Sequence, residues 1–176
     1  MEMLRDRIKG LEKKIVEMIR NGQDNVAIAD RLHRWTRALM LTADAAELPE
    51  VLLRELKLQF LIPQAGIRVW GVAEAWRSLP FAQGASEDAK SLATSLAVPY
   101  CGPNAGFEAA RWLDDAHTVA SMAMLPLRQA GGEAAFGLLV IGSPDATRYS
   151  ADMGTDFLVR IGEIASAGLA RLLPGR

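Results

Sequence analysis

The last third of the chain carries two apolar runs separated by a turn. Residues 119–127 and 136–141 are almost continuously apolar, and the turn between them contains Gly131 and Gly132. Runs of this length around a glycine turn predict two antiparallel strands joined as a hairpin. An amphipathic pattern follows over about 152–172, and it predicts a Ser-capped terminal helix. A hairpin that leads into a helix is the frame of a small sensory or binding domain and does not point to a reaction centre.

The composition bounds the class of protein. Half of the 176 residues are apolar, which is enough for one domain with a sizeable core plus an appendage. The 20 Lys and Arg nearly cancel the 21 Asp and Glu, so no global field attracts nucleic acid or an anionic membrane. The N-terminus does not resemble a signal segment, one cysteine excludes an internal disulfide, and the longest apolar runs have strand length. We therefore expect a cytoplasmic protein that binds neither nucleic acid nor membrane.

The N-terminal stretch repeats apolar residues at alternating spacings of three and four, which is a heptad pattern. The repeat starts at Met1 and continues through Leu4, Ile8, Leu11, Ile15 and Met18. β-Branched residues at one core position and Leu at the other favour a parallel pair of helices. Arg7 and Glu12 carry opposite charges at positions that face each other in such a pair. We therefore predict a homodimer whose interface includes Leu4, Ile8, Leu11, Ile15 and Met18.

The same repeat extends to Leu39, with Asn25 in the seam and Asn21-Gly22 as a weak point where the helix would kink or restart. We assign residues 1–41 to a coiled-coil dimerisation helix and residues 42–176 to the domain. The alternative is a helix that packs against its own domain.

Between these ends the sequence alternates helical and extended patterns. The expected elements are a helix over 48–60, a strand over 66–72, a loop over 77–86, a helix over 87–96, an extended piece over 98–103 and a short helix over 105–113. The order predicts an α/β fold of the α+β type, with an antiparallel central sheet flanked by helices and preceded by the long N-terminal helix.

Several segments carry a family resemblance. They are RLHR at 31–34, PYCG at 99–102, LPL at 125–127, FGLLVIGSPD at 136–145 and YSADMGTDFL at 149–158. Over roughly residues 10–172 the chain strongly resembles the bacterial domain-of-unknown-function family 484, itself similar to GAF domains. The resemblance implies a sheet of about five or six strands, with terminal helices on one side and a small-molecule pocket on the other. The family usually has a further N-terminal helical segment, whereas this chain starts directly in the heptad repeat.

An aromatic and methionine set comes from the elements that enclose the pocket in GAF-like folds. The candidate pocket residues are Trp70, Trp76, Tyr100, Cys101, Phe107, Trp112, Met122 and Met124. Apolar pockets with a few polar groups are typical of small-molecule sites. Met122 and Met124 share a parity and should face the same side of their strand. The alternative is that these residues are ordinary core.

Catalytic and cofactor motifs are weak. Phytochrome-like domains attach a bilin to a Cys that His typically follows, whereas Gly102 follows Cys101, and GAF-like methionine sulfoxide reductases need several cysteines. Cys101 is therefore expected to be a buried thiol beside the pocket. His33 and His117 lack metal-ligand spacing, and the pair Asp114-Asp115 is typical of a solvated turn. We predict no catalytic residue and no metal, and the sequence names no cofactor.

The leading hypothesis is a non-enzymatic GAF-like sensory or ligand-binding module, regulatory in role, that dimerises through its N-terminal helix and binds an unidentified small molecule. The alternative is a structural or adaptor dimer with a filled pocket, no ligand and a protein partner. An enzyme of unrecognised type comes third, because scattered residues on such a fold can host chemistry.

Overall fold

The computed structural model describes residues 2–150 and 155–175, and the chain divides into two compact units after Arg34. Helix α1 (Glu2–Leu41) runs through Asn21 and Gly22 without a break, so the kink allowed by the sequence is not formed. A single glycine costs a helix interior only about 1 kcal/mol, which the flanking helix-forming residues offset. Met1, the start of the predicted heptad repeat, lies outside the described residues.

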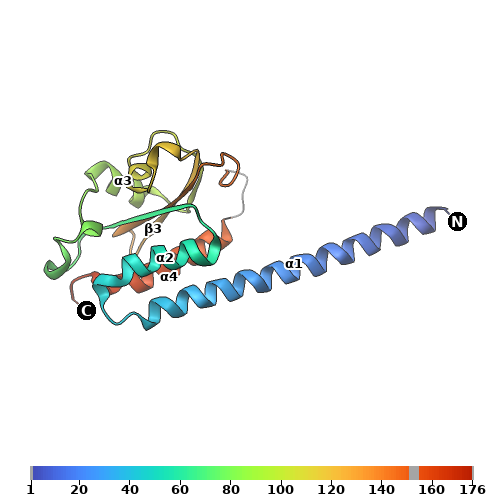
Figure 1. The fold of residues 1–176 in the computed structure, drawn as a ribbon, viewed down its shortest axis with the longest axis horizontal. Helices are drawn as coiled ribbons and strands as arrows, with labels where there is room; N and C mark the ends of the chain where they lie inside the picture. The colour runs from blue at the N-terminus through green and yellow to red at the C-terminus, as the bar shows by residue number, and fades with distance from the viewer. Residues whose placement is uncertain (1, 151–154, 176) are drawn as a thin grey trace. The chain divides into compact units, whose positions relative to one another are not determined.

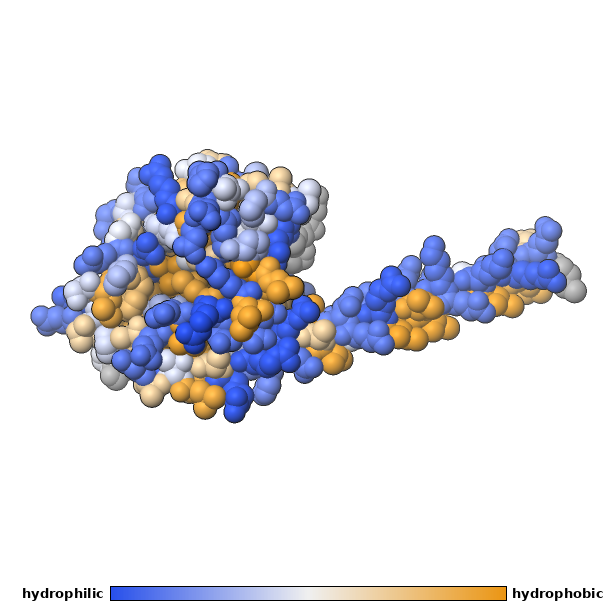
Figure 2. Space-filling view, viewed as in Figure 1, coloured by the Kyte–Doolittle hydropathy of each residue, from blue (hydrophilic) through white to orange (hydrophobic). Residues whose placement is uncertain are grey.

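The predicted seam of α1 is an exposed apolar stripe. Leu4, Ile8, Leu11, Ile15 and Met18 are between 54% and 71% exposed. Figure 2 shows hydrophobic side chains gathered along one edge of this helix and hydrophilic ones along the other. Burial within α1 begins only at Trp35 and Leu39, which belong to the second unit.

The second unit is built on an antiparallel sheet of four described strands in the order β1-β4-β3-β2. The strands are β1 (Gln64–Val69), β2 (Tyr100–Pro103), β3 (Ser121–Leu127) and β4 (Gly137–Ser143). The predicted hairpin is confirmed as β3 and β4, which pair from Ser121↔Ser143 to Leu127↔Gly137. The five or six strands implied by the family resemblance are four in the described part.

Strand β1 is displaced from the predicted range 66–72. It begins directly after Pro63 and ends before Gly71, whose φ of +65° takes the chain out of the extended region. Trp70 still donates its backbone N–H to Phe136 O at 2.8 Å, so the pairing with the hairpin continues one residue past the strand.

Two helices cover one face of the sheet, α2 (Leu48–Phe60) over β1 and α4 (Asp156–Leu169) over β3 (Figure 1). The bounds of α2 agree with the prediction, and its buried side includes Leu52 and Leu56. Buried Trp35 joins this layer by donating Nε1–H to Leu52 O at 3.1 Å. The terminal helix differs from its prediction: it begins at Asp156, and the N-cap residue Thr155 makes no side-chain capping bond. The predicted start at 152 lies outside the described residues.

The opposite face is covered by α3 (Glu87–Ser95) and by short 3₁₀ turns, as Figure 1 shows for α3. These turns include η3 (Pro80–Ala82), η4 (Glu108–Trp112) and η5 (Ala116–Thr118). The predicted helix over 105–113 is therefore only the turn η4, because Gly106 adopts φ +84° and delays its start. The remaining turns are η1 (Ala45–Glu47), η2 (Glu74–Trp76) and η6 (Ala170–Leu172). Within the described residues, no helix is long and apolar enough to cross a membrane.

Candidate functional site

Strand register decides which side chains share a face of the sheet. Tyr100 pairs with Met124, and Met124 pairs with Val140 on its other side. Val140 in turn pairs with Gly66 of β1. Directly paired residues point to the same side, and neighbours along a strand alternate. We call the face of the sheet that carries this row the pocket face. It also carries the residues two positions before and after the row in each strand.

The pocket face carries a hydrophobic cluster. Met122 and Met124 are fully buried, as are Leu138 and Val140. The partly buried residues Trp70, Tyr100, Phe107 and Trp112 pack against this cluster. The structure therefore gathers six of the candidate pocket residues: Trp70, Tyr100, Phe107, Trp112, Met122 and Met124.

Polar tips at the edge of the cluster are hydrogen-bonded to backbone. Trp70 donates Nε1–H to Ala135 O at 2.9 Å, and Tyr100 donates its hydroxyl to Pro103 O at 2.9 Å. The rings of Tyr100 and Phe107 meet edge to face with centroids 5.1 Å apart. These hydrogen bonds satisfy the polar groups of the two side chains, so their ring faces remain available for apolar contacts. Buried Tyr and Trp side chains favour this arrangement.

Cys101 and Trp76 lie outside this cluster. Cys101 pairs with Ala123, so the pleat turns its side chain to the face opposite Tyr100 and Met124. The structure thus differs from the expectation of a thiol beside the pocket. Burial raises the pKa of the Cys101 thiol, which leaves less of the nucleophilic thiolate. Trp76 belongs to turn η2, beyond the end of β1, and is half-buried.

Sequence reasoning missed two polar residues of β1 that share the pocket face. Gln64 is only 4% exposed. Its Nε2 group donates to Asp114 O at 2.6 Å and to Asp115 O at 3.1 Å, while its buried Oε1 accepts no hydrogen bond. Arg68 lies over the indole of Trp112, with Cζ 5.4 Å from the ring centroid. Gln64 lies outside the predicted strand, so no sequence signal indicated it. Arg68 lies inside the predicted range 66–72 and shares the parity of Trp70, so the alternation of the strand could have indicated it.

Gly66, between these two residues, allows Trp112 to approach the sheet. A Cβ at Gly66 would lie 2.8 Å from Trp112 O, closer than Cβ atoms come to other atoms in proteins. Any larger residue here would push turn η4, and Trp112 with it, away from β1.

The carboxylates and histidines stay on the surface. Lys57 donates to Asp114 Oδ2 at 2.9 Å, and the Asp114 side chain is 77% exposed, as expected for a solvated turn. His33 and His117 are both exposed. Among the described residues, no group of three or more His, Cys, Asp or Glu is placed to hold a metal ion.

A separate groove of about 480 Å³ lies between α4 and the end of β3. Leu125, Pro126 and Arg128 line one wall, and Val159, Gly162 and Ser166 line the other. Arg128 is held there by its backbone N–H to Ser166 Oγ and by side-chain bonds to the carbonyls of Thr94 and Glu133. The groove is therefore distinct from the aromatic cluster on the pocket face.

Residues 1–173 match the family described as "Protein of unknown function, DUF484". The chain belongs to this family. The match spans both units of the DUF484 protein, and no curated protein matches it. The resemblance inferred from the sequence is thereby confirmed.

Solved structures show the fold of this DUF484 protein to be GAF-like. The GAF domain of a phosphoenolpyruvate-protein phosphotransferase from Acinetobacter is 13% identical and covers 81% of this chain and 92% of its own, with a TM-score of 0.57. Free methionine-R-sulfoxide reductase from Neisseria meningitidis, solved with its substrate, is 12% identical over 81% of this chain and 87% of its own (TM-score 0.54). A phycoerythrobilin-bound GAF domain from a cyanobacterial phytochrome is 15% identical over 84% and 96% (TM-score 0.54). The neighbours include an enzyme and a chromophore-binding domain, so the fold alone does not assign the function.

Proposed function

We propose that this DUF484 protein is a non-enzymatic, regulatory GAF-like module that binds a small molecule on the pocket face and dimerises through α1. The observation that carries ligand binding is the convergence of aromatic and methionine side chains on that face, opposite α2 and α4. A mainly apolar lining with a few polar groups is what small-molecule sites have in common.

The apolar stripe of α1 supports the dimer. Ile8 and Ile15 are 54% and 55% exposed, and Leu11 is 59% exposed. Apolar residues in a heptad row bury best against the same row of a second copy. Paired helices would then give a ligand-binding domain a route by which its state reaches its partner.

A second candidate function is a structural or adaptor dimer whose pocket is filled by its own side chains. The observation that favours it is that Met122 and Met124 are each 0% exposed. On this alternative the protein has no small-molecule ligand and acts through a protein partner.

Native mass spectrometry of the gently purified full chain separates the two functions. The proposed function gives a dimer with a reproducible additional mass that belongs to a co-purified compound. A dimer with no additional mass supports the adaptor, and a monomer contradicts the role of α1 in both.

Substitution at Met122 locates the compound. The co-purified compound should raise the melting temperature of the wild type, and Met122→Trp should abolish that rise because the larger ring occupies the pocket face. Met122→Leu nearly conserves the volume and should keep the rise. If the rise is undiminished in a folded Met122→Trp protein, the compound binds elsewhere.

A further inference from the structure

Arg68 introduces a positive charge into an otherwise apolar face. The pleat gives it the same orientation as Gly66, and its partner across the sheet is Leu138. Among the described strand residues on the pocket face, Arg68 alone carries a formal charge. Its guanidinium lies over Trp112, which belongs to the same hydrophobic cluster.

The bonding capacity of this guanidinium is only partly used. Nη1 donates to Ile67 O at 2.7 Å, whereas Nε is buried and has no hydrogen-bond partner. None of the ion pairs between described side chains includes Arg68. Burial lowers its pKa from the usual value, because desolvation penalises the charged form. A charge held this way costs stability unless an anion compensates it.

The segment after turn η3 passes beside the unpaired nitrogen. Gly84 adopts φ +88°, which an L side chain rarely takes, and a Cβ there would lie 3.8 Å from Arg68 Nε. The glycine thus allows the backbone to pass close to the guanidinium, and no side chain of residue 84 contacts Nε.

We propose that Arg68 is the anion-recognition residue of the pocket face and that the ligand is a small organic carboxylate with a flat apolar body. The inference rests on the proposed function and names the chemical class of its ligand. The carboxylate oxygens accept from Nε and a neighbouring Nη, in the planar fork geometry that suits arginine. The body of the ligand packs against Trp112 and the cluster beside it.

The surroundings favour a carboxylate over a phosphate. One guanidinium balances the single charge of a carboxylate, whereas a phosphate near neutral pH carries more charge and needs more donors. The surrounding cluster is made of Met, Leu, Val, Ala and aromatic side chains, which suit an apolar body and offer no second cation.

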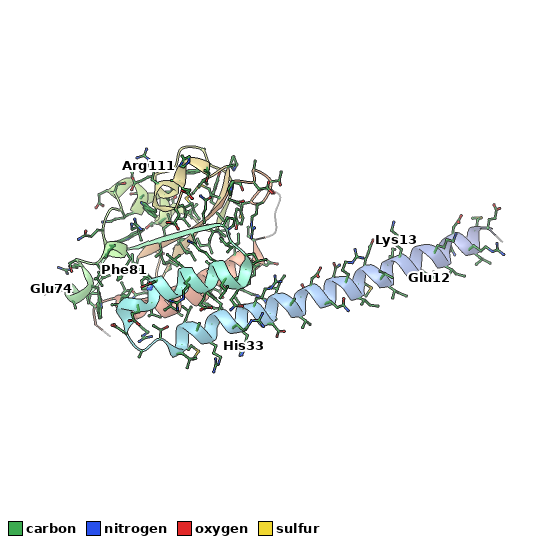
Figure 3. All side chains as sticks on the ribbon, in the orientation of Figure 1. Glu12, Lys13, His33, Glu74, Phe81 and Arg111 are labelled. Carbon is green, nitrogen blue, oxygen red and sulfur yellow. The ribbon has the colours of Figure 1, made fainter. Side chains whose placement is uncertain are left out.

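Benzoate and benzamide are matched probes, because they share a flat body and differ in the charge of the head. With the full chain, benzoate should raise the melting temperature and change the tryptophan fluorescence, and benzamide should do neither. Arg68→Gln should abolish the response to benzoate. Arg111→Gln is the control: this arginine is exposed on the same turn as Trp112, and Figure 3 shows it at the surface. Its response should match that of the wild type.

A stability measurement tests Arg68 without any probe. Arg68→Leu removes a half-buried charge that lacks a counter-ion, so its melting temperature should be at least that of the wild type. A clearly lower melting temperature means that Arg68 is a structural residue, which overturns the proposal.

The outcomes separate this inference from the proposed function. Equal responses to benzoate and benzamide, or a response that survives Arg68→Gln, keep a ligand site and overturn the carboxylate assignment. The absence of any response to benzoate also overturns that assignment. These outcomes leave the proposed function standing, because its ligand binding fails when native mass spectrometry finds no bound compound.

Discussion

At the scale of single residues, Cys101 shows how much depends on the parity of a strand. Its motif with Tyr100 and Gly102 was visible in the sequence, but adjacent residues of a strand face opposite sides. Only the pairing Tyr100↔Met124 and Cys101↔Ala123 shows which side each residue takes. The start of the strand explains why Gln64 was missed, because a strand predicted to begin at Gly66 gives no reason to consider it. Arg68 lies inside the predicted strand and shares the parity of Trp70, so it could have been found from the sequence.

The Cys101 thiol should react slowly. Burial raises its pKa, so the thiolate fraction near neutral pH is smaller than that of an exposed cysteine. We expect slow labelling by a thiol reagent at pH 7.5, faster labelling as the pH rises, and rapid labelling once the protein is unfolded in guanidinium chloride. Equal rates for the folded and unfolded protein at pH 7.5 would contradict this picture.

At the scale of elements, long periodic segments were predictable and short ones were not. The range of α2 and the β3–β4 hairpin follow from apolar periodicity and from the residues at their ends. Turn η4 was predicted as a helix, because periodicity over a few residues does not distinguish one 3₁₀ turn from a helical start. The sequence also did not indicate that Ser86, at the start of α3, is hydrogen-bonded to a residue of η4.

Ser86 caps α3 and binds Glu108 at the same time. Its Oγ accepts from Ala89 N at 3.1 Å, while its hydroxyl and its backbone N–H both donate to the Glu108 carboxylate. These bonds lower the pKa of Glu108, mainly through the Ser86 side chain. A lowered folded-state pKa gives stability that is present above the usual pKa of Glu and is lost as the pH falls through the lowered value.

Ser86→Ala should therefore have two effects. The free energy of unfolding should fall by about 1 kcal/mol at neutral pH, because the cap is lost. The pKa of Glu108 should rise toward its usual value, measured by NMR titration of the side-chain carboxyl. Ser95→Ala, at the other end of α3, removes only the bond from Ser95 Oγ to Leu92 O and should leave the Glu108 titration unchanged. An unchanged pKa of Glu108 in Ser86→Ala would show that the capping serine does not control this carboxylate.

At the scale of the whole molecule, the seam of α1 makes assembly testable separately from ligand binding. Replacing Ile8, Leu11 and Ile15 together by Asp puts charge into the apolar stripe and should give monomers in sedimentation velocity. Lys13→Asp with Arg20→Asp changes the charge of α1 at heptad positions outside the seam, and this control should stay dimeric. Lys13 and Glu12 are marked in Figure 3. Dimers that survive the triple substitution would show that the protein assembles through another surface.

The same helix allows a test of orientation. In a parallel pair Arg7 of one copy faces Glu12 of the other, and by symmetry this contact occurs twice. Arg7→Glu replaces both attractions by repulsions, so the dimer dissociation constant should rise about fivefold, or about 1 kcal/mol. Adding Glu12→Arg restores opposite charges and should restore the wild-type dissociation constant. In an antiparallel pair these two positions do not meet, so the second substitution would bring no recovery. Recovery by the double variant therefore distinguishes a parallel pair, which holds both domains at the same end, from an antiparallel one.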